Sequence, residues 1–163
     1  MGETSSSQTV STKLQRIAQQ ARECPEMVFT TLAHLIDVDF LREAHRRVNK
    51  KGAPGIDKVT AREYGANLEE NLVDLHNRMR QGRYKAPPVV RTWLEKENGK
   101  LRPIGKPTFE DKIVQRAVEM LLSAIYEERF YNFSHGFRKG RSQHLPGRSP
   151  RTLFSTPLRG IRT

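Results

Sequence analysis

The sequence of 163 residues is poor in cysteine, aromatic residues and long apolar runs. The single cysteine, Cys24, excludes an internal disulfide and is typical of a reducing compartment, so we expect a cytoplasmic location. No apolar run approaches the roughly 18 residues that a membrane-spanning helix needs, and we expect no membrane partner. The first residues, MGETSSSQTVST, lack the apolar core of a secretory signal.

Acidic residues are missing from the C-terminal part of the sequence. All 18 Asp and Glu residues lie at or before Glu128, whereas residues 129–163 hold eight Lys or Arg and no acid. These residues contribute most of the net charge of +11. A basic excess of this size favours a polyanionic partner, nucleic acid before membrane, although a solvated basic tail has the same composition.

Common signatures of a catalytic site are absent as well. The five histidines show no metal-ligand spacing, and no nucleophile motif such as G-x-S-x-G occurs. Adjacent carboxylates are interpreted as helix-end and surface charges, because neighbouring helix residues point in different directions; these pairs are Glu69-Glu70, Glu110-Asp111 and Glu127-Glu128. Residue types and spacing therefore predict no catalytic residue and no metal site.

Apolar periodicity predicts a helical segment over residues 13–49, preceded by a disordered polar leader at 1–12. Pro25 ends the first helix, because proline disfavours helix in the residue before it. The three helices expected in this segment cover 13–23, 26–36 and 39–49, with Asp39 as the cap of the last.

Residues 50–60, KKGAPGIDKVT, interrupt the helical pattern with a Gly-Pro turn that matches neither of the common phosphate-binding loops. The stretch TARE that follows has capping-box spacing and predicts a helix from 60 to about 80. Thr108 is the expected cap of a strongly amphipathic helix that ends near 129. Residues 145–163 have three prolines and no apolar period, so we expect a disordered basic tail.

Asn98-Gly99 predicts the turn of a β-hairpin between these last two helices, so the expected class is α+β. Two hairpin registers are open. A two-residue loop forms opposite-charge pairs across the strands, Glu95 with Arg102 and Glu97 with Lys100. A three-residue loop, with Gly99 in a left-handed bulge, brings three cations to one face, where they need an anion: Lys96, Lys100 and Arg102.

A second basic feature is the segment YNFSHGFRKGRSQH at 131–144, in which aromatic and basic residues alternate with glycine. Such interleaving suits single-stranded nucleic acid, because stacking then adds to phosphate contact. An ordinary basic loop has the same composition.

In this order, five segments resemble the N-terminal part of the reverse transcriptase of group II intron-encoded maturases. They are NKKGAPGIDKVT (49–60), NLEENL (67–72), GRYKAPPV (82–89), KENGKLRPIGKPTFEDKIVQRAV (96–118) and SHGFRKGRS (134–142). The resemblance covers about residues 35–144. It implies part of a right-hand polymerase that copies intron RNA into DNA with two metal ions, and a maturase activity that helps the intron RNA fold and splice.

On that resemblance, residues 50–144 form the fingers and the start of the palm. Lys96 and Arg102 would hold the incoming nucleotide triphosphate electrostatically, without acting as acid or base. The partners implied for the full-length family are RNA, a DNA primer and dNTP. The residues expected to contact template or intron RNA are Lys50, Lys51, Arg91, Lys100, Arg138, Lys139 and Arg141.

The match ends near His144, before the carboxylates that polymerisation needs. The family supplies them from a palm strand and a later Tyr-x-Asp-Asp hairpin, and this sequence has neither. We therefore expect a truncated fragment, inactive alone, that takes no cofactor; Mg²⁺ is expected only for the full-length enzyme. The tail at 145–163 has the pattern that a frameshift leaves, but a genuine short form is an alternative. The competing functions are a non-catalytic RNA-binding module and a non-functional remnant, and the oligomeric state stays open.

Overall fold

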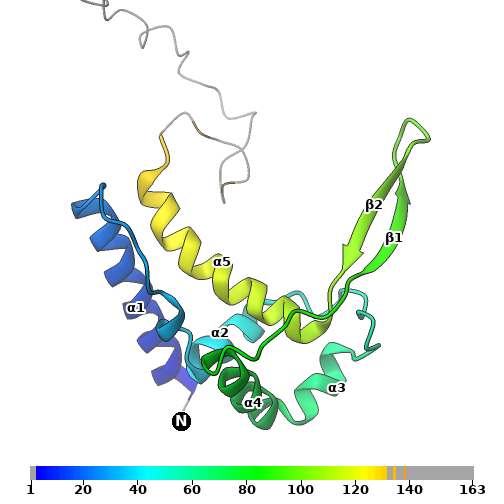
Figure 1. Cartoon of the computed structure of the whole chain (residues 1–163), viewed down its shortest axis with the longest axis horizontal. Coiled ribbons are helices and arrows are strands. Elements are labelled where there is room, and N and C mark those ends of the chain that lie inside the picture. The colour runs from blue at the N-terminus through cyan, green and yellow to red at the C-terminus, as the bar shows by residue number, and fades with distance from the viewer. Residues whose placement is uncertain (1–2, 132–133, 135–137, 139–163) are drawn as a thin grey trace, which may run out of the picture.

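The computed structural model describes residues 3–131, 134 and 138. Helix α1 projects beside α5, the short α2 lies against both, and the two-stranded hairpin extends from the body as a separate arm (Figure 1). This arrangement confirms the predicted α+β class and the hairpin ahead of a long helix. The elements are α1 (Glu3–Glu23), the 3-10 turn η1 (Ala33–Leu35), α2 (Val38–Arg47), α3 (Ala61–Ala66), α4 (Leu68–Arg80), β1 (Val90–Glu95), β2 (Leu101–Lys106) and α5 (Phe109–Arg129).

One hydrophobic cluster holds the helices together. Ile113, Ala117, Leu121 and Ile125 recur at helical spacing on the inner face of α5, which packs against α1 and α2. Fully burying one such Ile or Leu stabilises the fold by roughly 1.5–3 kcal/mol. The cluster also includes four fully buried side chains from the shorter helices: Phe40, Leu41, Leu72 and Leu75.

The prediction of a disordered leader is wrong for residues 3–12, which form the first half of α1. Val10 is fully buried, and Ile17 and Ala21 follow it on the same face of α1. The leader is polar in composition, and short polar segments have little helical stability of their own. Instead, the helix is stabilised by packing of this sparse apolar face against α5. The local sequence pattern of residues 3–12 does not reveal that packing.

The helix predicted over 26–36 is also wrong, since only Ala33–Leu35 make a 3-10 turn there. The preceding stretch is rich in β-branched residues, which have weak helix propensity, and Val28 is 79% exposed. Helix α2 begins one residue earlier than expected. Its cap is Asp37 in place of the predicted Asp39, because the Asp37 carboxylate accepts the Phe40 N–H at 2.9 Å.

The long helix predicted over 60–80 is divided into α3 and α4 at Asn67, whose φ of −120° and ψ of 43° are not helical. Both ends of the prediction are correct. Thr60 and Glu63 form the expected capping box, and Gly82 follows α4 with a φ of +67°. The break lets α4 turn its Leu72 and Leu75 toward the cluster.

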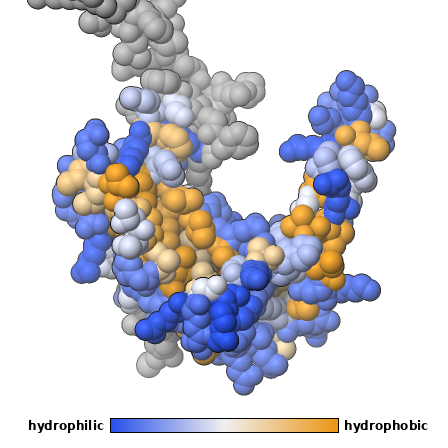
Figure 2. Space-filling model, viewed as in Figure 1, coloured by the Kyte–Doolittle hydropathy of each residue, from blue (hydrophilic) through white to orange (hydrophobic). Residues whose placement is uncertain are grey.

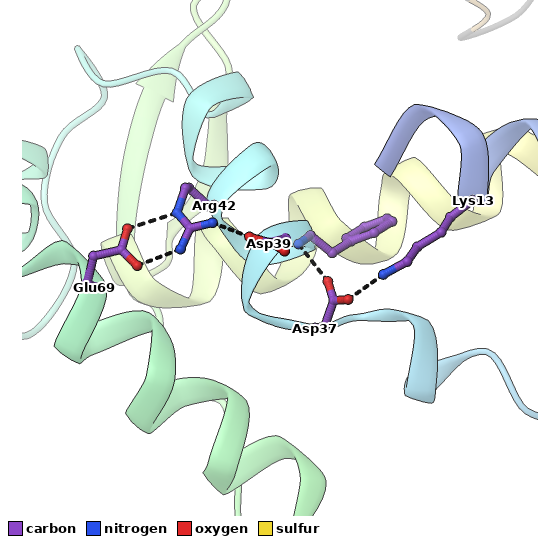
Figure 3. Close-up of polar contacts among 6 residues, drawn as sticks. Lys13, Asp37, Asp39, Arg42 and Glu69 are labelled. Atoms are coloured by element: carbon purple, nitrogen blue, oxygen red, sulfur yellow. Dashed lines mark hydrogen bonds and ion pairs between the residues drawn. The ribbon is translucent and has the colours of Figure 1, made fainter. Parts of the chain in front are cut away.

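Ion pairs fix α2 between α1 and α4 (Figure 3). Arg42 of α2 donates two hydrogen bonds to Glu69 of α4, at 2.8 and 2.6 Å, and this bidentate geometry is the stronger kind of Arg–carboxylate contact. Lys13 of α1 donates to the Asp37 carboxylate at the start of α2. Burial opposes ionisation of Asp37, but the hydrogen bonds from Lys13 and the Phe40 N–H, together with the charge of Lys13, outweigh it, so the pKa of Asp37 lies below its usual value.

Helix α5 carries a second apolar stripe that the body leaves uncovered within the described residues. Figure 2 shows hydrophobic side chains gathered along α5 and on the lower part of the hairpin. The exposed side chains of the α5 stripe are Val118, Leu122, Tyr126 and Phe130. No helix within residues 3–131 combines the length and hydropathy that a membrane crossing needs.

Candidate nucleic-acid interface

The hairpin adopts the three-residue loop. The Lys96 N–H donates to the Lys100 carbonyl at 2.9 Å, and Gly99 has a φ of +72°. Glu95 pairs with Leu101, so the register with Glu95 opposite Arg102 is excluded. Glycine at position 99 takes the left-handed conformation without the steric penalty of a side chain, which favours this turn.

The register brings three cations to one face of the hairpin. Arg102 pairs with Leu94, and Lys96 lies opposite Lys100, so strand alternation places Lys96, Lys100 and Arg102 on the same side. All three are exposed, and none forms an ion pair within the described part of the chain. Like charges directly opposite each other are destabilising, so a bound anion would relieve their repulsion.

The start of α5 anchors the base of the hairpin. Thr108, two residues after β2, accepts the Asp111 N–H at 3.3 Å as the predicted cap. Asp111 is buried, contrary to its interpretation as a surface charge, and accepts hydrogen bonds from the Tyr84 hydroxyl at 2.9 Å and the Gln115 amide at 2.7 Å. Burial raises the pKa of the Tyr84 hydroxyl, and its hydrogen bond to Asp111 raises the pKa further.

Neighbouring Glu110 connects the start of α5 to α3 and α4. It accepts a 2.8 Å hydrogen bond from Arg78 of α4 and a longer bond of 3.4 Å from the Tyr64 hydroxyl of α3. The two adjacent carboxylates thus point to different partners and serve as structural ties. They orient the helix that carries the arm.

The Gly-Pro loop packs on this junction. A Cβ atom added to Gly55 would lie 2.6 Å from both the Cα and the N of Thr108, so the two backbones are in direct contact. The Lys112 ammonium donates to the Ala53 carbonyl at 2.6 Å and holds the loop from the other side. Lys50 and Lys51 are exposed at the start of this loop.

The remaining predicted contact residues lie elsewhere. Arg91 is exposed on the hairpin face opposite the three cations. Arg138 is only 9% exposed and lies against the end of α5. Its guanidinium donates to Glu127 at 2.8 and 3.1 Å and lies 5.1 Å from the Phe130 ring centroid. Lys139, Arg141 and the tail at 145–163 lie outside the described residues.

Trp93 is an exposed residue that the pattern analysis assigned to no role. The signal for it was the position of a single indole within the short predicted strand ahead of the Asn98-Gly99 turn. For metals, residues 3–131, 134 and 138 contain no group of three His, Cys, Asp or Glu placed to hold an ion.

Comparisons with known proteins identify the lineage. No protein-family model matches the sequence. It is 37% identical over 139 residues to Protein YkfC of Escherichia coli, a match that covers 83% of this chain and 36% of YkfC. It is 38% identical over 136 residues to the group II intron-encoded protein LtrA of Lactococcus lactis, covering 80% of this chain and 22% of LtrA.

A shorter match reaches a plant protein. Nuclear intron maturase 1 of Arabidopsis thaliana is 40% identical over 60 residues, which are 35% of this chain and 8% of that protein. The chain thus spans about a third of YkfC and about a fifth of LtrA. With homology over most of its own length, the chain belongs to the family of group II intron-encoded reverse transcriptases and maturases.

Proposed function

We propose that this chain is the RNA- and nucleotide-binding fingers portion of a group II intron reverse transcriptase and maturase, with the start of the palm, and that it does not polymerise alone. The observation that carries the proposal is the cationic hairpin face, on which Lys96, Lys100 and Arg102 have no described acidic partner. Homologues named as intron-encoded proteins and an intron maturase support intron RNA as the polyanion.

The three cations would have different roles in binding. Lys96 and Arg102 would hold the triphosphate of a dNTP, Arg102 through its planar fork and Lys96 as a compact point charge. Lys100, together with Lys50 and Lys51 on the Gly-Pro loop, would contact RNA phosphates. Arg91, Lys139 and Arg141 complete the proposed RNA contacts, whereas Arg138 would have to leave its ion pair with Glu127 to reach RNA. A DNA primer would be bound only in the complete family enzyme.

No metal step is assigned to this chain. The described residues offer no carboxylate set for Mg²⁺, which needs several oxygen ligands. Mg²⁺ therefore belongs to the proposal only for a full-length relative. We expect the purified chain to give no Mg²⁺-dependent extension of a DNA primer on an RNA template, and DNA synthesis by the chain would contradict the proposal.

RNA binding is tested with a triple variant that removes three positive charges of the hairpin, Lys96→Ala, Lys100→Ala and Arg102→Ala. Binding of a fluorescein-labelled intron RNA is followed by anisotropy over a range of salt concentrations. Of the three, only Lys100 is assigned to an RNA phosphate, and each such contact on a single strand contributes a slope of about 0.7. The log–log salt dependence should therefore fall by about 0.7, whereas three RNA contacts would lower it by about 2. The matched control removes three exposed positive charges on helices outside the hairpin, Arg16, Arg62 and Arg80.

Equal loss of affinity in the triple variant and the control would refute a specific role for the hairpin, because net charge alone would then explain binding. Nucleotide binding is measured separately from RNA binding, in a competition experiment with unlabelled dNTP. Lys96→Ala and Arg102→Ala should each weaken it, whereas Lys50→Ala should not. A dNTP affinity unchanged in both hairpin variants would remove the nucleotide part of the proposal.

A further inference from the structure

The hairpin exposes an indole on the face opposite its three cations. Trp93, the single tryptophan of the sequence, is 54% exposed. Within the described residues its side chain makes no ring contact or hydrogen bond. Leu101, at 62% exposure, and the exposed Pro103 lie on the same face, so the indole is part of an apolar patch.

The strand register places this indole opposite a proline. Trp93 pairs with Pro103, and because Lys96 and Lys100 form a hydrogen-bonded pair, alternation makes Trp93–Pro103 a non-hydrogen-bonded pair. Side chains approach each other most closely in such pairs. Proline fits this site on β2, since no ladder bond needs its missing N–H. The indole therefore lies across from a proline ring at the middle of the arm.

Arg91 lies two residues before Trp93 on the same strand and the same face. It is exposed and has no ion pair in the described part of the chain. An aromatic platform beside a free guanidinium is the arrangement by which proteins bind single-stranded nucleic acid, with a base on the ring and a phosphate on the cation.

We propose that Trp93 stacks on a base of single-stranded RNA and that Arg91 contacts the adjoining phosphate. This inference rests on the proposed function and divides the hairpin into two working faces, one electrostatic and one stacking. The arm extends away from the helical body, so a strand can reach both faces (Figure 1).

RNA is favoured over a protein as the occupant because of charge. Residues 90–106 contain five Lys or Arg and only two Glu, which leaves the whole arm positive. An apolar protein surface would gain nothing from those cations, whereas an RNA strand uses both the indole and the charge.

Because the sequence has one tryptophan, its emission reports on this site alone. The full chain is titrated with unlabelled oligouridylate while tryptophan fluorescence is recorded, and binding is measured separately by anisotropy of the same RNA carrying fluorescein. We expect quenching that saturates with the dissociation constant found by anisotropy. Trp93→Ala should weaken binding about 5- to 150-fold, the range for one stacked base, and Trp93→Phe should restore much of it.

Leu94→Ala is the matched control, since Leu94 is the next residue of β1, is similarly exposed and lies on the other face. It should bind RNA as the parent chain does. Circular dichroism melting confirms that each variant folds, and removal of an exposed side chain should leave the melting temperature nearly unchanged.

The outcomes separate the two proposals. If labelled RNA binds but the emission of Trp93 stays constant, the stacking inference is overturned and the proposed function stands. If no RNA binds at all, the proposed function fails and the inference fails with it. A concentration-dependent emission change in the absence of RNA, matched by dimer formation in sedimentation, would assign the patch to a second copy and overturn the stacking inference.

Discussion

Replacing Gly55 by alanine tests whether the Gly-Pro loop is packed on the base of the hairpin as described. The added methyl would lie 2.6 Å from the Cα and N of Thr108 and 2.8 Å from the carbonyl carbon of Pro107. All three are backbone atoms at the cap of α5, so no side-chain rotation can make room. Either the loop moves away or the cap shifts.

The size of the effect follows from these two responses. Overpacking a close contact typically destabilises by about 1–3 kcal/mol. A displaced Thr108 would also lose its hydrogen bond from Asp111, which is worth about 1 kcal/mol as a helix cap. We therefore expect Gly55→Ala to lower the free energy of unfolding by about 2–4 kcal/mol, a fall of several degrees in melting temperature for a chain of this length.

Gly65→Ala is the matched control, because Gly65 lies within α3 and no atom is found within 4 Å of the position its Cβ would take. Alanine there should stabilise the protein by roughly 0.5–1 kcal/mol through its better helix propensity. Both variants are compared by urea unfolding with circular dichroism. Equal stability of Gly55→Ala and the parent chain would show that the loop does not contact Thr108, and the described site would then be wrong.

Three further predictions concern the helices. His45 is buried, and its Nε2 has no hydrogen-bond partner within the described residues. Burial, followed by the charge of Lys50, lowers its folded pKa, so stability should be full above the unfolded value of about 6.5 and fall as pH drops through the folded pKa. Melting curves should show a smaller fall in His45→Gln. Ile125→Ala should destabilise by about 2–5 kcal/mol, whereas Leu122→Gln, at a position 42% exposed one turn away, should change stability little; urea unfolding of both variants measures the difference. Arg138→Ala should speed hydrogen exchange in the last turn of α5, because it removes the ion pair that closes that end; unchanged exchange would contradict this role.

Local patterns in the sequence determined several features correctly. Thr108 and the apolar repeat behind it place α5 and its cap, since capping and helical periodicity depend on residues within a few positions of each other. Asn98-Gly99 determined that a hairpin turns there, because few residues other than glycine accept the left-handed turn conformation. The succession of matching sequence segments between residues 49 and 142 predicted the lineage that the comparisons then showed.

Only the tertiary structure decided the features that depend on partners distant in sequence. Residues 3–12 are helical because Val10 packs into a cluster dominated by α5, more than 100 residues away. Asp111 is a buried tie because Tyr84 reaches it, although its own neighbours in sequence resemble those of a surface acid. The sequence left two hairpin registers open, and the structure decided that Lys96, Lys100 and Arg102 share a face. Burial and long-range pairing set these outcomes, and a sequence read residue by residue does not contain them.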